Sequence, residues 1–288
     1  MIYLFYRVIF NLLKCLEAMF MNKEKFKKIA FFLLKRLLIY SLLIISIPLL
    51  LGYIFMEKLL LPEVKTADRN GNTVIFSNNF ELDAFFHPPL PGKDVILYNH
   101  GNGETLESIM PLLNEFIRQG YGVMAYDYAG YGFSQGKASE KQLYSDAGSV
   151  YDFLTCQQKI PPQNIIVMGF SAGSGGACFL AEKHPEIKAL VLLAPFASAI
   201  EVILPCPLPG NRFDNKKRLK NSKVPLLIFH GSSDRIIPLR NARTLYQAAN
   251  MPKKLIVIKN ADHNTLFDFM GAKFFKELAD FIRLLCSR

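Results

Sequence analysis

One serine in the chain has the sequence surroundings of a nucleophile. Ser171 lies in the pentapeptide Gly169–Phe170–Ser171–Ala172–Gly173, between an apolar run and a stretch typical of a helix. A sharp strand-to-helix turn lifts such a hydroxyl above its sheet, and glycines two positions before and after it avoid a clash. The G-x-S-x-G pattern in this context therefore predicts that Ser171 is a nucleophile.

A serine hydroxyl needs a base, and the chain offers one downstream. Asp234 lies just beyond one apolar run, and His263 lies just beyond the next. We expect His263 to take the Ser171 proton and Asp234 to orient His263 and stabilise its imidazolium form. Asp262 is the weaker alternative for that acid, because the side chains of adjacent residues point apart.

Negative charge that develops on a substrate oxygen needs N–H donors nearby. The first expected donor is Ala172, which directly follows the nucleophile. The second is expected in the loop His100–Gly101–Asn102–Gly103–Glu104, where glycines let the backbone approach a ligand. Asn102 is the first choice in that loop and Gly103 is the second. The residues expected to be structural are His87, His100, His184, His230 and Asp127.

The elements that must position these residues alternate along the chain. Two short β-rich runs joined by a polar turn come first, at 73–77 and 82–86. Strands are expected next at 94–99, 122–127, 164–169, 189–194, 225–230 and 254–259, and helices at 105–119, 140–156, 173–183, 239–250 and 265–285. Nearly continuous apolar strands separated by helices indicate a doubly wound, mostly parallel α/β sheet with helices on both faces. The chemistry of such sheets lies at the carboxyl ends of the strands.

Together these motifs resemble the α/β-hydrolase superfamily, and specifically its membrane-anchored serine hydrolases with little or no cap domain. The matching residues are His-Gly-Asn-Gly at 100–103, Asp-Tyr-Ala-Gly-Tyr-Gly-Phe-Ser at 127–134, Gly-Phe-Ser-Ala-Gly at 169–173, His-Gly-Ser-Ser-Asp at 230–234 and Asp-His-Asn at 262–264. The resemblance covers residues 70–285 approximately. It implies ester, thioester or amide hydrolysis through an acyl-enzyme, without a metal or organic cofactor. The family often has Leu where Ala172 stands, which leaves the backbone N–H in place.

Residues 196–223 fall where this fold inserts a cap. The segment is too short for a separate cap domain and predicts an open or lightly lidded site. It holds six basic residues, Arg212, Lys216, Lys217, Arg218, Lys220 and Lys223. They are interpreted either as an ordinary solvated face or as a contact with anionic lipid or an anionic substrate.

The N-terminal region contains a membrane segment. Leu37–Phe55 has no charged residue, and its 19 residues would extend about 28 Å as a helix, enough to cross a hydrocarbon core. We expect an uncleaved anchor, because no small-x-small cleavage site follows; a signal peptide and a buried core helix are the alternatives. Residues 1–20 either lie in the membrane interface or precede a true start at Met21.

Length and charge fit an N-terminal anchor region at 1–60 and a catalytic domain at 61–288. Of the 34 Lys and Arg residues, nine fall in residues 1–58, against three Asp or Glu there. The net charge of +10 therefore indicates a membrane as partner and not a nucleic acid. The five cysteines are scattered and odd in number, which favours isolated thiols and leaves one disulfide open.

The first functional hypothesis is a membrane-anchored serine hydrolase that cleaves carboxylic esters or thioesters, including lipid-like acyl groups. Amide or peptide hydrolysis by the same triad is the alternative, since only the acyl and leaving-group pockets would distinguish the two. A non-catalytic binding protein on the same fold is a third hypothesis, and it would require a broken triad that the sequence does not have.

Six basic residues precede Leu37–Phe55 closely, at 23–36, and three follow it within 20 residues. The positive-inside rule therefore predicts a cytoplasmic N-terminus and a catalytic domain outside the cytoplasm. A reporter enzyme that works only outside the cytoplasm should be active when fused after residue 70 and inactive when fused after residue 30. The reverse pattern would place the catalytic domain in the cytoplasm.

Overall fold

The computed structural model describes residues 23–66, 68–199 and 212–286, together with Arg7, Asn11 and Val202. Contacts along the chain group it into two compact units, Met1–Met56 and Glu57–Arg288. The alternative start at Met21 lies outside the described residues. Residues 1–20, apart from Arg7 and Asn11, also lie outside the described residues, so their interfacial placement stays a prediction.

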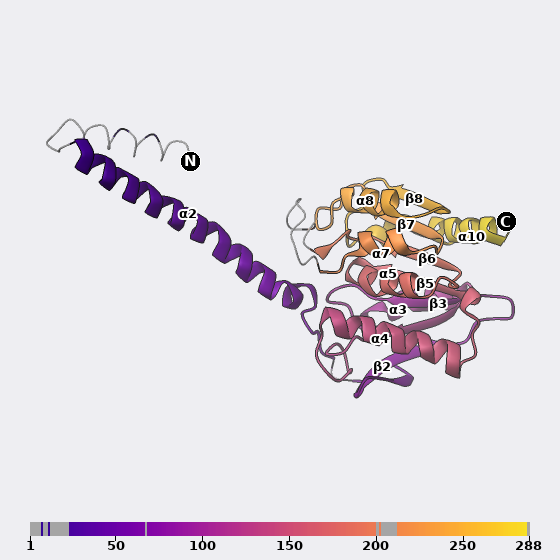
Figure 1. Ribbon diagram of the computed structural model, residues 1–288. Coiled ribbons are helices and arrows are strands. Elements are labelled where there is room, and N and C mark those ends of the chain that lie inside the picture. The colour runs from indigo at the N-terminus through magenta and orange to yellow at the C-terminus, as the bar shows by residue number, and fades with distance from the viewer. Residues whose placement is uncertain are drawn as a thin grey trace. The chain divides into compact units, whose positions relative to one another are not determined.

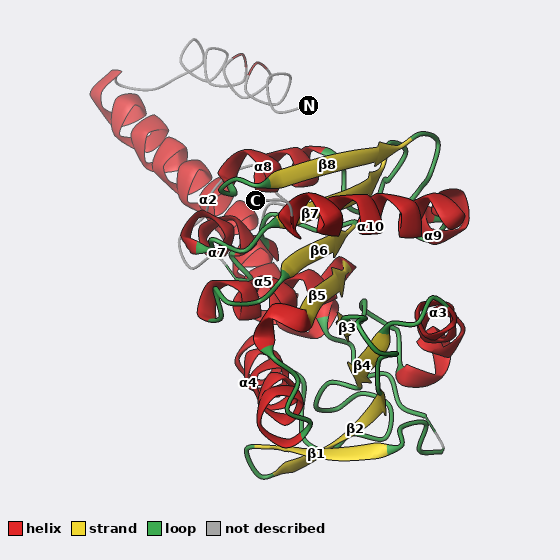
Figure 2. Ribbon diagram, turned by 90° about the vertical axis from the view of Figure 1, so that its right-hand side faces the viewer, coloured by secondary structure: helices red, strands yellow, loops and turns green. Residues whose placement is uncertain are grey.

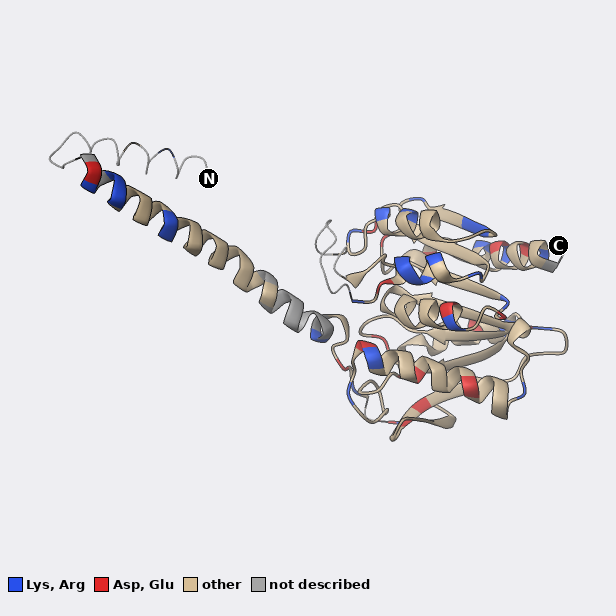
Figure 3. Cartoon of the chain, in the orientation of Figure 1, with Lys and Arg blue, Asp and Glu red and all other residues tan. Residues whose placement is uncertain are grey.

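One long helix, α2 (Lys23–Leu60), carries the apolar N-terminal sequence (Figure 1). Within it, Lys27–Pro48 is long and apolar enough to cross a membrane, with a mean hydropathy of 2.0 and no part buried in the protein. This stretch starts ten residues before the expected Leu37–Phe55, and both lie in the same helix. Figure 3 shows basic residues gathered toward the N-terminal end of α2.

In the described residues, the unit Glu57–Arg288 contains one sheet of eight strands in the order β1-β2-β4-β3-β5-β6-β7-β8. The strands are β1 (Thr73–Ser77), β2 (Phe80–His87), β3 (Val95–Asn99), β4 (Gly122–Tyr126), β5 (Ile165–Phe170), β6 (Ala189–Leu193), β7 (Leu226–Gly231) and β8 (Lys253–Ile258). β1 and β2 form an antiparallel hairpin that adds to β4, and all other neighbours are parallel. This is the mostly parallel α/β-hydrolase sheet that the sequence predicts.

Helices cover both faces of the sheet (Figure 2). They are α3 (Leu106–Arg118), α4 (Glu140–Asp152), α5 (Ser174–Lys183), α7 (Asn215–Asn221), α8 (Arg240–Ala248), α9 (Leu266–Met270) and α10 (Ala272–Cys286). α3, α9 and α10 lie on one face, and α4, α5, α7 and α8 lie on the other. On the first face, α3 buries the stripe Leu106, Ile109, Leu113 and Phe116, which is the periodicity of a helix with one side in the core.

Three features of the helices differ from the sequence expectation. The helix expected at 265–285 is broken at Gly271, whose φ of +46° a helix cannot contain. The helix expected at 140–156 is an α-helix only as far as Asp152, where α4 ends, and a π-helical turn at Phe153–Gln157 continues it. The short helix α7 begins where Asp214 accepts a hydrogen bond from the Lys217 N–H, an N-cap that the sequence reading did not identify.

The strand register brings the candidate site residues to one edge of the sheet. Asn99 at the end of β3 is opposite Gly169, Phe170 at the end of β5 is opposite Leu193, and Gly231 is opposite Ile258. The loops that follow β3, β5, β7 and β8 therefore meet beyond this edge.

Arg218 does not belong to a basic surface cluster, which corrects the sequence interpretation. Its guanidinium is paired with Glu182 and lies 4.4 Å from the ring centre of Tyr144 and 5.3 Å from that of Phe179. Arg218 thus holds α7 against α4 and α5. The lysines of this segment, Lys216, Lys217, Lys220 and Lys223, are exposed. Residues 200, 201 and 203–211 of the expected lid lie outside the described residues.

Arg218→Ala should lower the free energy of unfolding by about 1–3 kcal/mol, because it removes an ion pair and two cation–π contacts at a helix interface. Lys217→Ala, on the exposed side of the same helix, should change it by about 0.5 kcal/mol or less. Circular-dichroism melting of both variants measures the difference, at about 2–4 °C per kcal/mol for a domain of this size. Equal melting temperatures would show that Arg218 does not hold α7 in place.

Candidate active site

Three loops at the carboxyl edge of the sheet bring Ser171, Asp234 and His263 together. The Ser171 hydroxyl is 2.9 Å from His263 Nε2, and His263 Nδ1 is 2.8 Å from Asp234 Oδ2. All three are buried, with 7–8% of each residue exposed. The chain of contacts allows the hydroxyl to donate to Nε2 while the Nδ1–H donates to the carboxylate.

Ser171 lies in a strained turn between β5 and α5. Its φ is +50°, in the left-handed region that residues other than glycine seldom adopt. A Cβ on Gly169 would lie 2.6 Å from the Gly173 carbonyl oxygen, and a Cβ on Gly173 would lie 2.1 Å from the Asn99 carbonyl oxygen. The two glycines are therefore required by the space available. The Ser174 hydroxyl donates to the Ser171 carbonyl at 2.6 Å and holds the turn.

Asp234 is oriented by its own loop. Its Oδ1 accepts the N–H groups of Ile236 at 3.0 Å and Ile237 at 2.7 Å, which leaves Oδ2 to face His263. Buried His230 lies behind it, with Nε2 donating to the Ile237 carbonyl at 2.8 Å and 3.5 Å from Asp234 Oδ2. Burial lowers the pKa of His230, so a neutral imidazole supports this loop.

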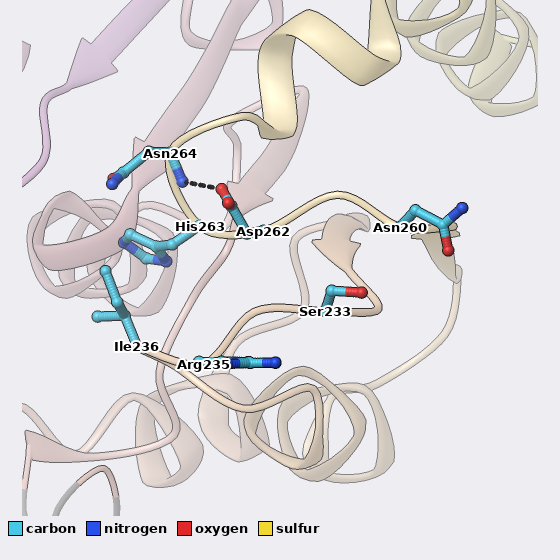
Figure 4. A pocket seen from close by; sticks show the side chains of 7 residues that line it. All are labelled: Ser233, Arg235, Ile236, Asn260, Asp262, His263 and Asn264. Atoms are coloured by element: carbon cyan, nitrogen blue, oxygen red, sulfur yellow. Dashed lines mark hydrogen bonds between the residues drawn. The ribbon is translucent and has the colours of Figure 1, made fainter.

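The alternative acid, Asp262, has another role. Its Oδ1 accepts hydrogen bonds from the Asn264 N–H, the Thr265 N–H and the Thr265 hydroxyl, all at 2.9–3.0 Å. The hydrogen bonds from Thr265 lower the pKa of this exposed carboxyl. Asp262 thus closes the turn before α9, and Figure 4 shows its carboxylate directed to Asn264 beside a cavity of about 370 Å³ that His263 also lines.

The loop after β3 is held by its own side chains. Glu104 Oε2 accepts the Gly101 N–H at 2.5 Å, and the Glu104 N–H donates to the Gly101 carbonyl at 3.3 Å. A Cβ on Gly101 would lie 2.7 Å from the Phe170 ring, so this loop packs directly against the residue before Ser171. The two expected donors, Asn102 and Gly103, lie on the exposed part of the loop, and Gly103 has a φ of +77°.

His100 and Asp127 form a buried pair beneath this loop. His100 stacks on Tyr128 with ring centres 4.0 Å apart, and its Nδ1 donates to the Gly101 carbonyl at 2.8 Å. Asp127 Oδ1 accepts the Leu106 N–H at 2.8 Å and lies 3.7 Å from His100 Nε2. Burial lowers the pKa of His100 to about 4 and raises that of Asp127 to about 7. The pair supports the start of α3 and makes no contact with Ser171.

Two residues of the site were missed by sequence reasoning. His230 was expected to be a strand-end residue, yet it touches the carboxylate of Asp234. Glu104 was read only as the last residue of the loop, yet it closes that loop through Gly101. An acid three residues after a glycine, just before a helix, is the signal that could have indicated Glu104.

The chain belongs to the α/β-hydrolase superfamily. A family model described as alpha/beta hydrolase fold matches residues 94–211, and one described as serine aminopeptidase S33 matches residues 214–269. The uncharacterised protein YfhR of Escherichia coli O157:H7 is 30% identical over 65% of this chain and 69% of its own length. The alpha/beta hydrolase domain-containing protein aho-3 of Caenorhabditis elegans is 29% identical over 69% of this chain, which spans 60% of that relative's length.

Solved structures share the fold at low sequence identity. Est1E of Butyrivibrio proteoclasticus, solved with ferulic acid, is 18% identical with a TM-score of 0.62, covering 75% of this chain and 100% of its own. The esterase domain of a Rhodothermus marinus protein is 23% identical with a TM-score of 0.55, covering 72% of this chain and 94% of its own. These likenesses show the fold of this chain, and its activity is argued below from its own residues.

The buried pair gives the folded state a specific dependence on pH. With a folded-state pKa of about 7 in place of 3.8, Asp127 keeps a proton that the unfolded chain releases, which lowers stability as pH rises from about 4 to about 7. His100, at about 4 in place of 6.5, has the opposite effect over that range.

Asp127→Asn should leave only the His100 effect. The stability of this variant relative to the wild type should therefore increase from pH 4 to pH 7, by at most about 1.4 kcal/mol per pH unit. Urea unfolding at several pH values measures the difference. Ser134→Ala is the control, because it removes a hydrogen bond to the Asp127 carbonyl without removing the carboxyl group. A difference that stays constant with pH in Asp127→Asn would contradict the shifted ionisations.

Proposed function

We propose that the protein is a membrane-anchored serine hydrolase that cleaves carboxylic esters or thioesters through an acyl-enzyme. The single observation that carries the proposal is the continuous contact from Ser171 through His263 to Asp234, with both distances below 3.0 Å. Sequence order, strand-end placement and the strained turn at Ser171 support the same assignment.

In the first half of the reaction, Ser171 Oγ bonds to the acyl carbon while its proton passes to His263 Nε2. The imidazolium that forms is stabilised by Asp234, whose Oδ2 accepts from Nδ1. Negative charge on the former carbonyl oxygen is stabilised by hydrogen bonds from the N–H of Ala172 and the N–H of Asn102. Gly103 is the second choice for the donor in the loop after β3. When the bond to the leaving group breaks, His263 returns the proton to the departing oxygen or sulfur.

In the second half, water replaces the leaving group. His263 takes one proton of the water as its oxygen bonds to the acyl carbon, and it then gives that proton to Ser171 Oγ as the acyl-enzyme bond breaks. The products are a carboxylic acid and the regenerated hydroxyl. Besides the substrate and water, every step uses only side chains and backbone groups of the chain, so the proposal includes no metal and no organic cofactor.

Amide hydrolysis is the second candidate. It is favoured by the match of residues 214–269, which contain Asp234 and His263, to the serine aminopeptidase model. A panel of chromogenic substrates with one acyl group and ester, thioester or amide leaving groups distinguishes the candidates. The ester proposal expects the ester and thioester to turn over and the amide to be a poor substrate.

The proposal places the protein in a membrane through α2, with the catalytic domain 61–288 outside the cytoplasm. The apolar stretch within α2, which has no buried part, supports the anchor, and the preceding basic residues support the orientation. Contact of the exposed lysines of α7, Lys216, Lys217 and Lys220, with anionic lipid is part of the same proposal. The expected partners are the acyl substrate and the membrane.

Ser171→Ala and His263→Ala should each reduce ester turnover by about 10⁴- to 10⁶-fold and abolish labelling by a fluorophosphonate probe. Asp234→Asn should reduce turnover by about 10⁴-fold, because it disturbs the histidine tautomer. Asp262→Asn is a matched control, since an asparagine oxygen can accept the same hydrogen bonds before α9. Initial rates on the ester and gel-based labelling report both properties. Labelling that persists in Ser171→Ala would place the nucleophile elsewhere.

A further inference from the structure

Glu104 is an acidic residue of the site that the triad does not use. It lies between β3 and α3, directly before Thr105, the N-cap residue of α3. Its side chain is partly buried, and its Oε2 accepts the Gly101 N–H at 2.5 Å. A carboxylate that accepts from a backbone amide at this distance makes a strong, charge-assisted hydrogen bond. Partial burial takes water away from the carboxylate, and the Gly101 N–H replaces part of that hydration.

Gly101 is held from several sides. The His100 Nδ1–H and the Glu104 N–H both donate to its carbonyl oxygen, at 2.8 Å and 3.3 Å. Its Cα lies so close to Phe170 that an added Cβ would be 2.7 Å from the ring. Phe170 in turn directly precedes Ser171, so the position of Gly101 is fixed relative to the nucleophile.

The peptide that follows Gly101 carries the Asn102 N–H. In a trans peptide the C=O and the N–H point in opposite directions. The donors that hold the Gly101 carbonyl on one side therefore direct the Asn102 N–H to the other side. A rotation of this peptide would break the hydrogen bonds to the Gly101 carbonyl and turn the Asn102 N–H to another direction. The Gly101 N–H lies in the preceding peptide, and its hydrogen bond to Glu104 holds the backbone on that side of the Gly101 Cα.

We propose that Glu104 is a positioning residue for the oxyanion hole: its carboxylate holds the Gly101 N–H, in the peptide before the one that carries the Asn102 N–H, and its own N–H donates to the Gly101 carbonyl, so that together the two hydrogen bonds keep the Asn102 N–H in place. The inference rests on the proposed function, because only a reaction with a developing oxyanion needs that N–H. Glu104 touches no reacting atom and acts through Gly101.

The negative charge of Glu104 is a second property, and it can be separated from the hydrogen bond. Burial raises the pKa of Glu104, while the Gly101 N–H and the nearby His263 act against that rise. Glutamine has nearly the same shape and keeps an acceptor oxygen but carries no charge. Methionine has a similar length with neither charge nor a strong acceptor. The pair of variants therefore isolates the hydrogen bond at nearly constant side-chain volume.

The test uses the full chain in detergent with a soluble chromogenic ester. Glu104→Met and Glu104→Ala should reduce kcat by about 10²-fold, comparable to the loss of one oxyanion donor, with KM within about threefold of the wild type. Glu104→Gln should keep kcat within about tenfold of the wild type, because its amide oxygen can still accept the Gly101 N–H. Glu107→Ala, at an exposed position in the first turn of α3, is the control and should leave kcat unchanged.

A trifluoromethyl ketone provides a readout that a general loss of structure would not give. Ser171 Oγ adds to its carbonyl carbon, the hydroxyl proton passes to His263, and the resulting hemiketal oxygen carries the negative charge of an oxyanion. Its inhibition constant should rise in Glu104→Met by the same factor by which kcat/KM falls, and it should change little in Glu104→Gln.

Two results would overturn the proposal: wild-type kcat in Glu104→Met, or a loss in Glu104→Gln as large as that in Glu104→Met. The second result would assign the effect to the charge and not to the hydrogen bond. Circular-dichroism melting identifies a variant that does not fold, and the comparison then depends on the glutamine variant and its ketone inhibition. Failure of the proposed function is recognised separately, by fluorophosphonate labelling that persists in Ser171→Ala.

Discussion

The site depends on one close approach of two backbones. The Gly173 Cα lies so near the end of β3 that an added Cβ would be 2.1 Å from the Asn99 carbonyl oxygen. This contact joins the turn after β5 to the loop after β3, and the parallel pairing of these strands ends at the same place, where Asn99 is opposite Gly169. The turn at Ser171 and the loop with the second expected donor are therefore positioned against each other by the sheet itself. Any residue larger than glycine at 173 would separate them.

Buried polar groups hold the loops around this contact. Asp234 is satisfied by two backbone N–H groups and by His263, and His230 supports the same loop from below. Asp127 caps the start of α3, and Glu104, which is partly buried, closes the loop after β3. Each of these side chains loses hydration on folding and recovers hydrogen bonds only if its loop takes one conformation. The hydrogen bonds of these side chains thus favour one conformation of each loop.

The sequence was most informative where a local pattern determines the structure. Apolar runs separated by amphipathic stretches predicted the parallel strands to within one residue at their ends, and the Gly-x-Ser-x-Gly pattern predicted the turn at Ser171. The sequence was least informative where the role of a residue depends on a partner that is distant along the chain. Arg218 looks like one of six cations in sequence, and only the packing of α7 on α4 and α5 pairs it with Glu182. His230 likewise acquires its role from the fold, through Asp234.

The same distinction explains why the two acidic residues near His263 have different roles. Asp262 is adjacent to His263 in sequence, but its carboxylate accepts hydrogen bonds within the turn that begins α9. Asp234 is 29 residues away along the chain, yet the pairing of β7 with β8 places the loops that follow them side by side. Proximity in the sheet therefore outweighs proximity in sequence. For the same reason, substrate preference must be sought among residues from separate loops that meet at this edge, where Arg235, Ile236 and Asn264 surround the cavity beside His263.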